Sequence, residues 1–225
     1  MEMAQRLEEM PLFPLNTVLF PYAEVQLHVF EDRYRELVHD CLSEDRPFGV
    51  VLIRSGSEVG GPAEPYLVGT AVRILKVETY DDGRMDIRVK GERRFRIRQL
   101  DESGVYLTGY VEPVVEHPVE AGPWAEEVIH RAREEGAMFI QRMFARQQFK
   151  VQVVFPEDPM EFSFTLANLI PMEDLDKQRM LETTDTLERV QDLLPIIEQQ
   201  LMEEIPDPST YRLTAHDLKE WILPN

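Results

Sequence analysis

The chain has 225 residues, of which 43% are hydrophobic and 9% aromatic. This composition is ordinary for a globular protein and excludes a disordered chain or a disulfide scaffold. The length allows one large domain or two smaller ones, each with a workable core. The 42 acidic residues outnumber the 24 basic ones, and the resulting net charge of −18 disfavours nucleic acid as a partner because it repels phosphate backbones.

The N-terminus and the cysteine content indicate the compartment. The first ten residues, MEMAQRLEEM, carry charge where a signal peptide needs an apolar stretch, and no run of about 18 apolar residues occurs in the sequence. Cys41 is the only cysteine, so the chain offers neither an intrachain disulfide nor a cysteine cluster for zinc. We therefore expect a cytoplasmic protein that does not cross a membrane.

The first half of the chain alternates short runs of Val, Ile, Phe and Tyr that predict strands. These runs span residues 25–30, 48–54, 67–80, 84–90, 94–100 and 105–115. One segment, residues 31–44, has helical periodicity instead. Its apolar positions predict one buried helical face, formed by Tyr34, Leu37, Val38, Cys41 and Leu42. Because Cys41 lies within this stripe, we interpret it as a packing residue.

Turn-forming residues divide the chain further. Residues 55–65 contain three glycines and two prolines without hydrophobic periodicity, which predicts a surface loop. The Asp-Asp-Gly sequence at residues 81–83 predicts a hairpin. Between residues 116 and 123 the pattern changes from strand to helix. We therefore expect a β-rich lobe of residues 1–118 and a helical lobe with a C-terminal tail, residues 119–225.

The second half predicts helices over residues 124–146 and 160–170, and a last long helix that begins near Asp185. That helix carries an apolar stripe at alternating steps of three and four residues: Leu187, Val190, Leu194, Ile197 and Leu201. We expect Pro195 to interrupt this stripe and intramolecular packing to bury it. Dimerisation of two copies through the helical lobe is the alternative.

Three collinear segments resemble the N-terminal domain of the Lon protease family. The first, residues 10–38, contains PLFPL and the sequence FEDRYR. The second, residues 66–97, contains the VGT of Val68, Gly69 and Thr70, followed by Gly91, Arg94 and Ile97 at the spacing of the family. The third, LANLIPMEDLDKQRMLETTDTLERVQDLL, resembles the helical half of the family domain. We expect Gly69 and Gly91 where the backbone bends sharply or takes a positive φ.

The resemblance implies an α+β fold, in which a PUA-like β pseudobarrel with one inserted helix is followed by a C-terminal helical lobe. It also implies binding of unfolded or tagged polypeptide segments through apolar surface. We expect six residues to contact such a segment: Phe30, Arg33, Tyr34, Tyr66, Arg94 and Met143. For Phe30 and Tyr34 the alternative is packing in the core.

The sequence contains no pattern that predicts catalysis. It lacks the G-x-x-x-x-G-K-[ST] phosphate loop of an ATPase, and its serines have no context resembling the Ser–Lys pair of a Lon protease. The five histidines are scattered, with no H-E-x-x-H pair to bind a metal. We therefore expect no catalytic residue, no metal and no cofactor, and we interpret the chain as a binding module rather than an enzyme.

Two alternative functions remain open at the level of the sequence. The basic segment 84–98 could bind RNA, as PUA-like folds elsewhere do, although alternating cations are also typical of an ion-paired sheet face. The segment 209–225 could be a docking arm of an adaptor that delivers clients to a separate protease or chaperone. In that segment Thr214 and Asp217 resemble a capping box, and Leu218, Trp221 and Ile222 would share a helical face.

Overall fold

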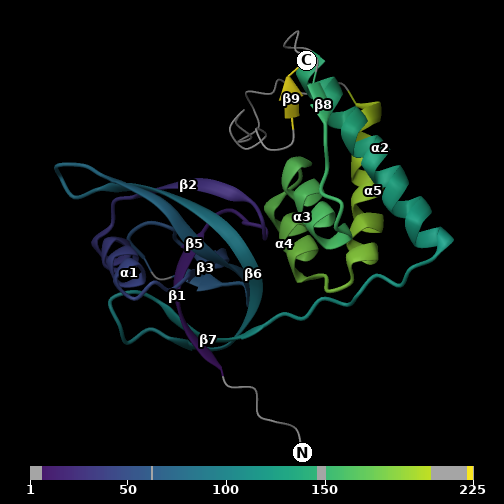
Figure 1. The fold of residues 1–225 in the computed structure, drawn as a ribbon. Coiled ribbons are helices and arrows are strands. Elements are labelled where there is room, and N and C mark those ends of the chain that lie inside the picture. The colour runs from purple at the N-terminus through teal and green to yellow at the C-terminus, as the bar shows by residue number, and fades with distance from the viewer. Residues whose placement is uncertain (1–6, 62, 146–150, 204–221, 225) are drawn as a thin grey trace, which may run out of the picture. The chain divides into compact units, whose positions relative to one another are not determined.

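The computed structural model describes residues 7–61, 63–145, 151–203 and 222–224 (Figure 1). The chain divides into two compact units, Met1–Val115 and Glu116–Asn225. The first unit is β-rich and the second is mainly helical. None of the described helices is long and apolar enough to span a membrane.

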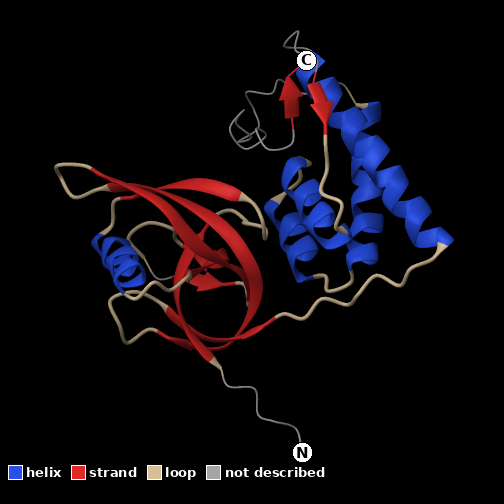
Figure 2. Ribbon diagram, viewed as in Figure 1, coloured by secondary structure: helices blue, strands red, loops and turns tan. Residues whose placement is uncertain are grey.

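The β-rich unit is a sheet that closes on itself. Its strands are β1 (Glu8–Leu15), β2 (Glu24–Val29), β3 (Phe48–Gly56), β4 (Ala63–Pro65), β5 (Val68–Thr79), β6 (Met85–Asp101) and β7 (Thr108–Pro113). Hydrogen-bonded neighbours run β1-β7-β6-β5-β3, and a parallel pairing of β1 with β3 closes the ring (Figure 2). The expected α+β fold is confirmed.

Helix α1 (Asp32–Ser43) covers part of the barrel core. Tyr34, Leu37, Val38 and Cys41 are buried as the periodicity predicts. Leu42 is 49% exposed, so its expected place on the buried face is wrong. At one residue past Cys41 the helix has already turned by about 100°, which carries Leu42 out of the stripe.

Strand β6 is longer than the sequence predicts. Residues 85–90 and 94–100 of the two predicted segments belong to one strand of 17 residues, and the shift of register that separates them lies where Gly91 and Arg93 pair with β5. Neither Gly69 nor Gly91 has a positive φ. Both positions require glycine because the backbone of another segment lies close to them. A Cβ on Gly91 would lie 2.3 Å from the Phe20 carbonyl oxygen, and a Cβ on Gly69 would lie 2.5 Å from the Val50 carbonyl oxygen.

The predicted hairpin at residues 81–83 is present. The Tyr80 amide N–H donates to the Arg84 carbonyl at 2.9 Å, and Gly83 takes a positive φ of 83°. The predicted loop 55–65 is only partly a loop, because β4 pairs with the end of β3. Its three residues are too few for alternation to reveal a strand in the sequence.

The second unit contains α2 (Pro123–Ala145), α3 (Pro159–Leu169), α4 (Asp174–Glu182) and α5 (Thr186–Met202). Helix α5 packs against α2 and α3 (Figure 1), and Val190, Leu194 and Ile197 are buried in this packing. The stripe therefore faces the interior of its own unit. Helix α5 continues through Pro195, which is exposed and lies outside the buried face.

Two short strands, β8 (Val151–Val153) and β9 (Ile222–Pro224), pair antiparallel in this unit. Ile222 was expected on a helix, and this expectation is wrong because the residue belongs to β9. The remainder of the expected terminal helix, including Thr214, lies outside the described residues.

Candidate functional site

Three of the six expected contact residues are buried. Tyr34 is 5% exposed, and Arg94 and Met143 are each 4% exposed. The Tyr34 ring stacks on Phe13 with centroids 4.0 Å apart, and burial raises the pKa of its hydroxyl to about 12. Side chains this enclosed offer no surface to another chain, so we correct the expectation for these three residues.

Arg33 holds a loop in place. Its guanidinium donates to the carbonyl oxygens of Gly61, at 3.1 Å, and Glu58, at 3.3 Å, and it lies 4.5 Å from the centroid of the Tyr34 ring. The Gly60 amide N–H donates to Glu31, which also pairs with Arg33 at 3.1 Å. Arg33 therefore fixes the β3–β4 loop to the start of α1, and these contacts occupy most of its polar atoms.

Phe30 and Tyr66 remain accessible to different degrees. Phe30 follows the last residue of β2 and is 46% exposed. Tyr66 is half-buried between β4 and β5, and its amide N–H donates to the Leu52 carbonyl at 2.8 Å. Of the six residues, the structure brings Arg33 and Tyr34 into contact, whereas Met143 belongs to the other unit.

A group of residues that the sequence did not single out surrounds Phe30. We call the ribbon formed by β2, residues 73–79 of β5 and residues 85–90 of β6 the arm. On its inner face, Ile87 of β6 lies between Leu27 of β2 and Val77 of β5, and these three side chains pack on the core. On its outer face, His28 lies opposite Asp86. Alternation along β2 puts Gln26, His28 and Phe30 on this outer side, and all three are exposed.

Asp86 is the centre of the outer face. Its carboxylate accepts a hydrogen bond from the Tyr80 hydroxyl at 2.6 Å and one from Gln26 at 3.3 Å, and it lies 2.6 Å from Nδ1 of His28. The hydrogen bonds from Tyr80 and then His28 lower the pKa of the Asp86 carboxyl. The hydrogen bond with Asp86 raises the pKa of Tyr80 in turn. Asp86 is therefore an anion at neutral pH.

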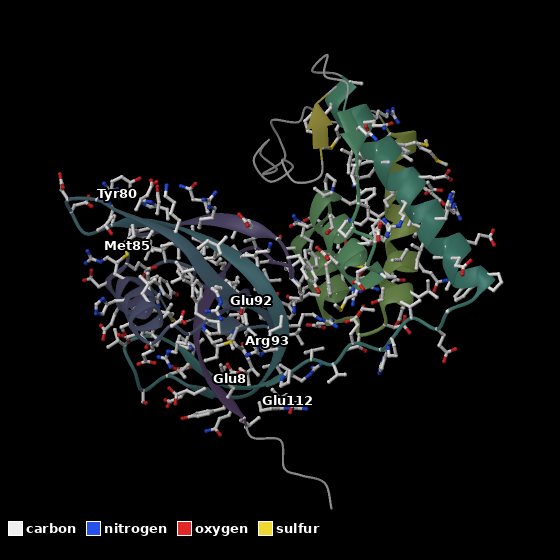
Figure 3. All side chains as sticks on the ribbon, in the orientation of Figure 1. Glu8, Tyr80, Met85, Glu92, Arg93 and Glu112 are labelled. Carbon is white, nitrogen blue, oxygen red and sulfur yellow. The ribbon has the colours of Figure 1, made fainter. Side chains whose placement is uncertain are left out.

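Two further aromatic rings lie near the His28 ring. The His28 ring lies 6.0 Å from Phe30 and 6.3 Å from Tyr80, centroid to centroid. Tyr80 is 45% exposed and stands at the end of the β5–β6 hairpin (Figure 3). We call Phe30, His28, Tyr80 and Asp86 the aromatic patch. Its exposed rings suit contact with apolar or planar groups.

The comparisons with known proteins decide the family. The sequence model of the ATP-dependent protease La (LON) substrate-binding domain matches residues 9–199. The chain belongs to this family.

Relatives of this LON substrate-binding domain protein include proteins named Lon protease. The chain is 27% identical over 205 residues to Lon protease of Syntrophus aciditrophicus (strain SB), covering 86% of this chain and 25% of that protein. It is 24% identical over 206 residues to Lon protease of Escherichia coli (strain K12), covering 89% of this chain and 26% of that protein. The chain thus spans about a quarter of the length of these curated relatives.

Solved structures agree with the fold. A Lon N-terminal domain protein from Xanthomonas campestris matches with a TM-score of 0.62 and 28% identity, over 84% of this chain and 98% of that one. The N-terminal domain of Mycobacterium avium complex Lon protease matches with a TM-score of 0.64 and 20% identity, over 85% and 98%. The second likeness shows the fold alone.

Cations in the basic segment 84–98 pair with nearby carboxylates. Arg84 pairs with Asp82 at 2.6 Å, Arg93 with Glu8 at 2.5 Å, and Arg98 with Glu112 at 2.5 Å. Figure 3 shows Arg93 and Glu8 beside each other. These pairs neutralise much of the positive charge that binding of RNA through this segment requires.

The described residues show neither an activated cysteine nor a cluster of metal-binding side chains. Burial raises the pKa of the Cys41 thiol to about 11, so the thiolate that would act as a nucleophile is scarce at neutral pH. Among the same described residues, no group of three or more His, Cys, Asp or Glu side chains could hold a metal ion.

Proposed function

We propose that this chain binds unfolded or tagged polypeptide segments and performs no covalent chemistry itself. The match of residues 9–199 to a substrate-binding domain carries the proposal. We place the binding on the β-rich unit, where the aromatic patch exposes two large rings, Phe30 and Tyr80. Clients of this kind vary in sequence, so a receptor needs apolar contact that many segments can satisfy.

The edge of β2 supports this placement. Strand β2 pairs with β6 on one side, and among the described residues no strand pairs with its other side. Such an edge presents unpaired backbone N–H and C=O groups, which can bind an extended chain whatever its sequence. Its residues, EVQLHV, contain no proline or lysine that would protect the edge. The patch lies at the end of this strand.

A binding titration tests the proposal. The probe is a reduced, carboxymethylated and fluorescently labelled unfolded protein, and binding is followed by fluorescence anisotropy. We expect saturable binding that weakens about tenfold or more in the Phe30→Ala/Tyr80→Ala double variant, since tenfold corresponds to about 1.4 kcal/mol and a single hot-spot residue of an interface carries about 2 kcal/mol or more.

A matched double variant controls for the loss of exposed apolar area. Leu42 and Val105 are 49% and 58% exposed in the same unit and lie outside the patch. The Leu42→Ala/Val105→Ala variant should bind as the unchanged chain does. Absence of saturable binding contradicts the function, and an equal loss in both double variants contradicts the placement on the patch.

Partners and location follow from the same proposal. We propose a cytoplasmic setting, no cofactor, and clients that pass on to a protease or chaperone. The docking-arm alternative for the tail receives no support from its described part, because Ile222–Pro224 pairs with β8 in its own unit. Dimerisation through the apolar stripe of α5 receives no support either, since Val190, Leu194 and Ile197 of that stripe are buried where α5 packs against α2 and α3.

A further inference from the structure

The aromatic patch contains a negative charge whose described partners are neutral groups or a histidine. Asp86 is bound by Tyr80, Gln26 and His28, and none of the arginines or lysines of the arm pairs with it in the described structure. Glu78, which lies opposite Asp86 on β5, pairs with Lys76, and Arg84, two residues before Asp86, pairs with Asp82. The side chain of Asp86 is 18% exposed, so a cation from outside can reach it.

The rings beside Asp86 determine which cation fits. A guanidinium is planar, stacks on aromatic faces and pairs with a carboxylate through two N–H groups. The patch offers both features within one site, because the ring of His28 lies about 6 Å from the rings of Phe30 and Tyr80 and its Nδ1 lies 2.6 Å from Asp86. An ammonium is compact and more strongly hydrated, and it gains less from the rings.

We infer that the aromatic patch selects polypeptide segments that carry an arginine, with the guanidinium paired to Asp86 and stacked on Phe30 or Tyr80. The inference rests on the proposed polypeptide-binding function and names the substrate class. Charge favours it at long range as well, since the chain carries a net charge of −18 and attracts basic segments. The carboxylate in turn repels phosphate groups, so this site disfavours RNA and anionic lipid headgroups.

Two peptides and two variants test the inference. The peptides are unfolded fifteen-residue segments that differ in one residue, arginine in the first and citrulline in the second, which keeps the shape and removes the charge. We expect the arginine peptide to bind about tenfold tighter at low salt, and the difference to shrink as salt rises. The Asp86→Asn variant should bind both peptides equally.

The control variant is Asp101→Asn, which removes one carboxylate charge from the other end of β6, where Asp101 accepts a hydrogen bond from the Ser103 amide. This variant should keep the preference for arginine. Equal binding of the two peptides by the unchanged chain overturns the inference, as does a preference that survives in Asp86→Asn. In either case, if the unfolded protein probe still binds, the proposed polypeptide-binding function is retained. If neither the unfolded protein nor either peptide binds, the proposed function and the inference are both overturned.

Discussion

Arg189 is a charged side chain with no exposed surface. Its guanidinium donates to Ser163 Oγ at 2.6 Å and to the carbonyl oxygens of Met180 and Thr183, and it pairs with Glu116 at 2.5 Å. It also lies 3.8 Å from the centroid of the Phe164 ring. Burial lowers the pKa of this guanidinium, and the Glu116 carboxylate opposes the shift. One side chain therefore joins α3, the end of α4 and the start of the helical unit.

Replacing Arg189 should destabilise the helical unit severely. The Arg189→Met variant keeps about the same volume but removes the guanidinium that binds Glu116, Ser163 and the carbonyl oxygens of Met180 and Thr183. We expect a loss of about 3 kcal/mol or more in the free energy of unfolding, measured by urea denaturation with circular dichroism at 222 nm.

Arg131 provides the matched control for Arg189. It also forms ion pairs, with Glu135 and Glu198, but its side chain is 54% exposed. The Arg131→Met variant should lose less than about 1 kcal/mol, because exposed ion pairs contribute little. Similar losses in the two variants would refute the role that we assign to burial.

The structural role of Arg189 cannot be predicted from the sequence motif that contains it. The sequence resemblance includes Asp185 and Arg189 at a spacing of four residues. In the structure Asp185 caps α5 by accepting from the amides of Leu187 and Glu188, at 2.8 and 3.0 Å. The capping role of Asp185 follows from its residue type and its position before the helix. The role of Arg189 does not follow from the sequence, because its hydrogen-bond partners come from three other segments.

At the scale of elements, β6 depends on a close approach of two backbones. The Gly91 amide N–H donates to the Ala23 carbonyl at 2.9 Å, and the Gly91 carbonyl accepts from the Tyr22 amide at 2.9 Å. These bonds draw the segment before β2 against β6. The space for a side chain at residue 91 is consequently filled by the Phe20 carbonyl.

A methyl group at residue 91 should strain this contact. We expect Gly91→Ala to cost about 2 kcal/mol of unfolding free energy, the range found for overpacked sites, because the obstructing atom is backbone. Thermal and urea denaturation measure the loss. Gly104→Ala is the control, since its nearest obstacle is 3.4 Å away. A Gly91→Ala variant as stable as Gly104→Ala would show that the two segments separate at little cost.

At the scale of the whole molecule, the chain consists of two units whose division falls between Val115 and Glu116. Glu116 belongs structurally to the helical unit through its bonds with Arg189 and Thr186. The aromatic patch belongs entirely to the β-rich unit. We therefore propose that the boundary lies at residue 116, close to the boundary at residue 118 that composition suggests.

Separate expression of the two parts tests this organisation. A fragment of residues 1–115 should unfold cooperatively, because its sheet closes within the fragment, and it should bind the unfolded protein probe within about threefold of the whole chain. A fragment of residues 116–225 should not bind the probe. Loss of binding by a folded first fragment would place the binding surface elsewhere.

The sequence by itself determined the elements whose periodicity is local. The inner stripe of α1, the hairpin at residues 81–83 and the cap of α5 at Asp185 each depend on neighbours within a few residues, so type and spacing suffice to predict them. The collinear motifs also predicted the family, and the family in turn predicted the α+β fold.

Only the tertiary structure determined the aromatic patch and which of the expected contact residues are buried. The pairing of β2 with β6 brings His28 to Asp86 across 58 residues, and the hairpin adds Tyr80, yet no local pattern encodes that register. Likewise, Phe30 and Tyr34 are both aromatic and lie four residues apart, but Phe30 is exposed whereas Tyr34 is buried. Periodicity reports which residues share a face of one element, but what covers that face is set by distant parts of the chain.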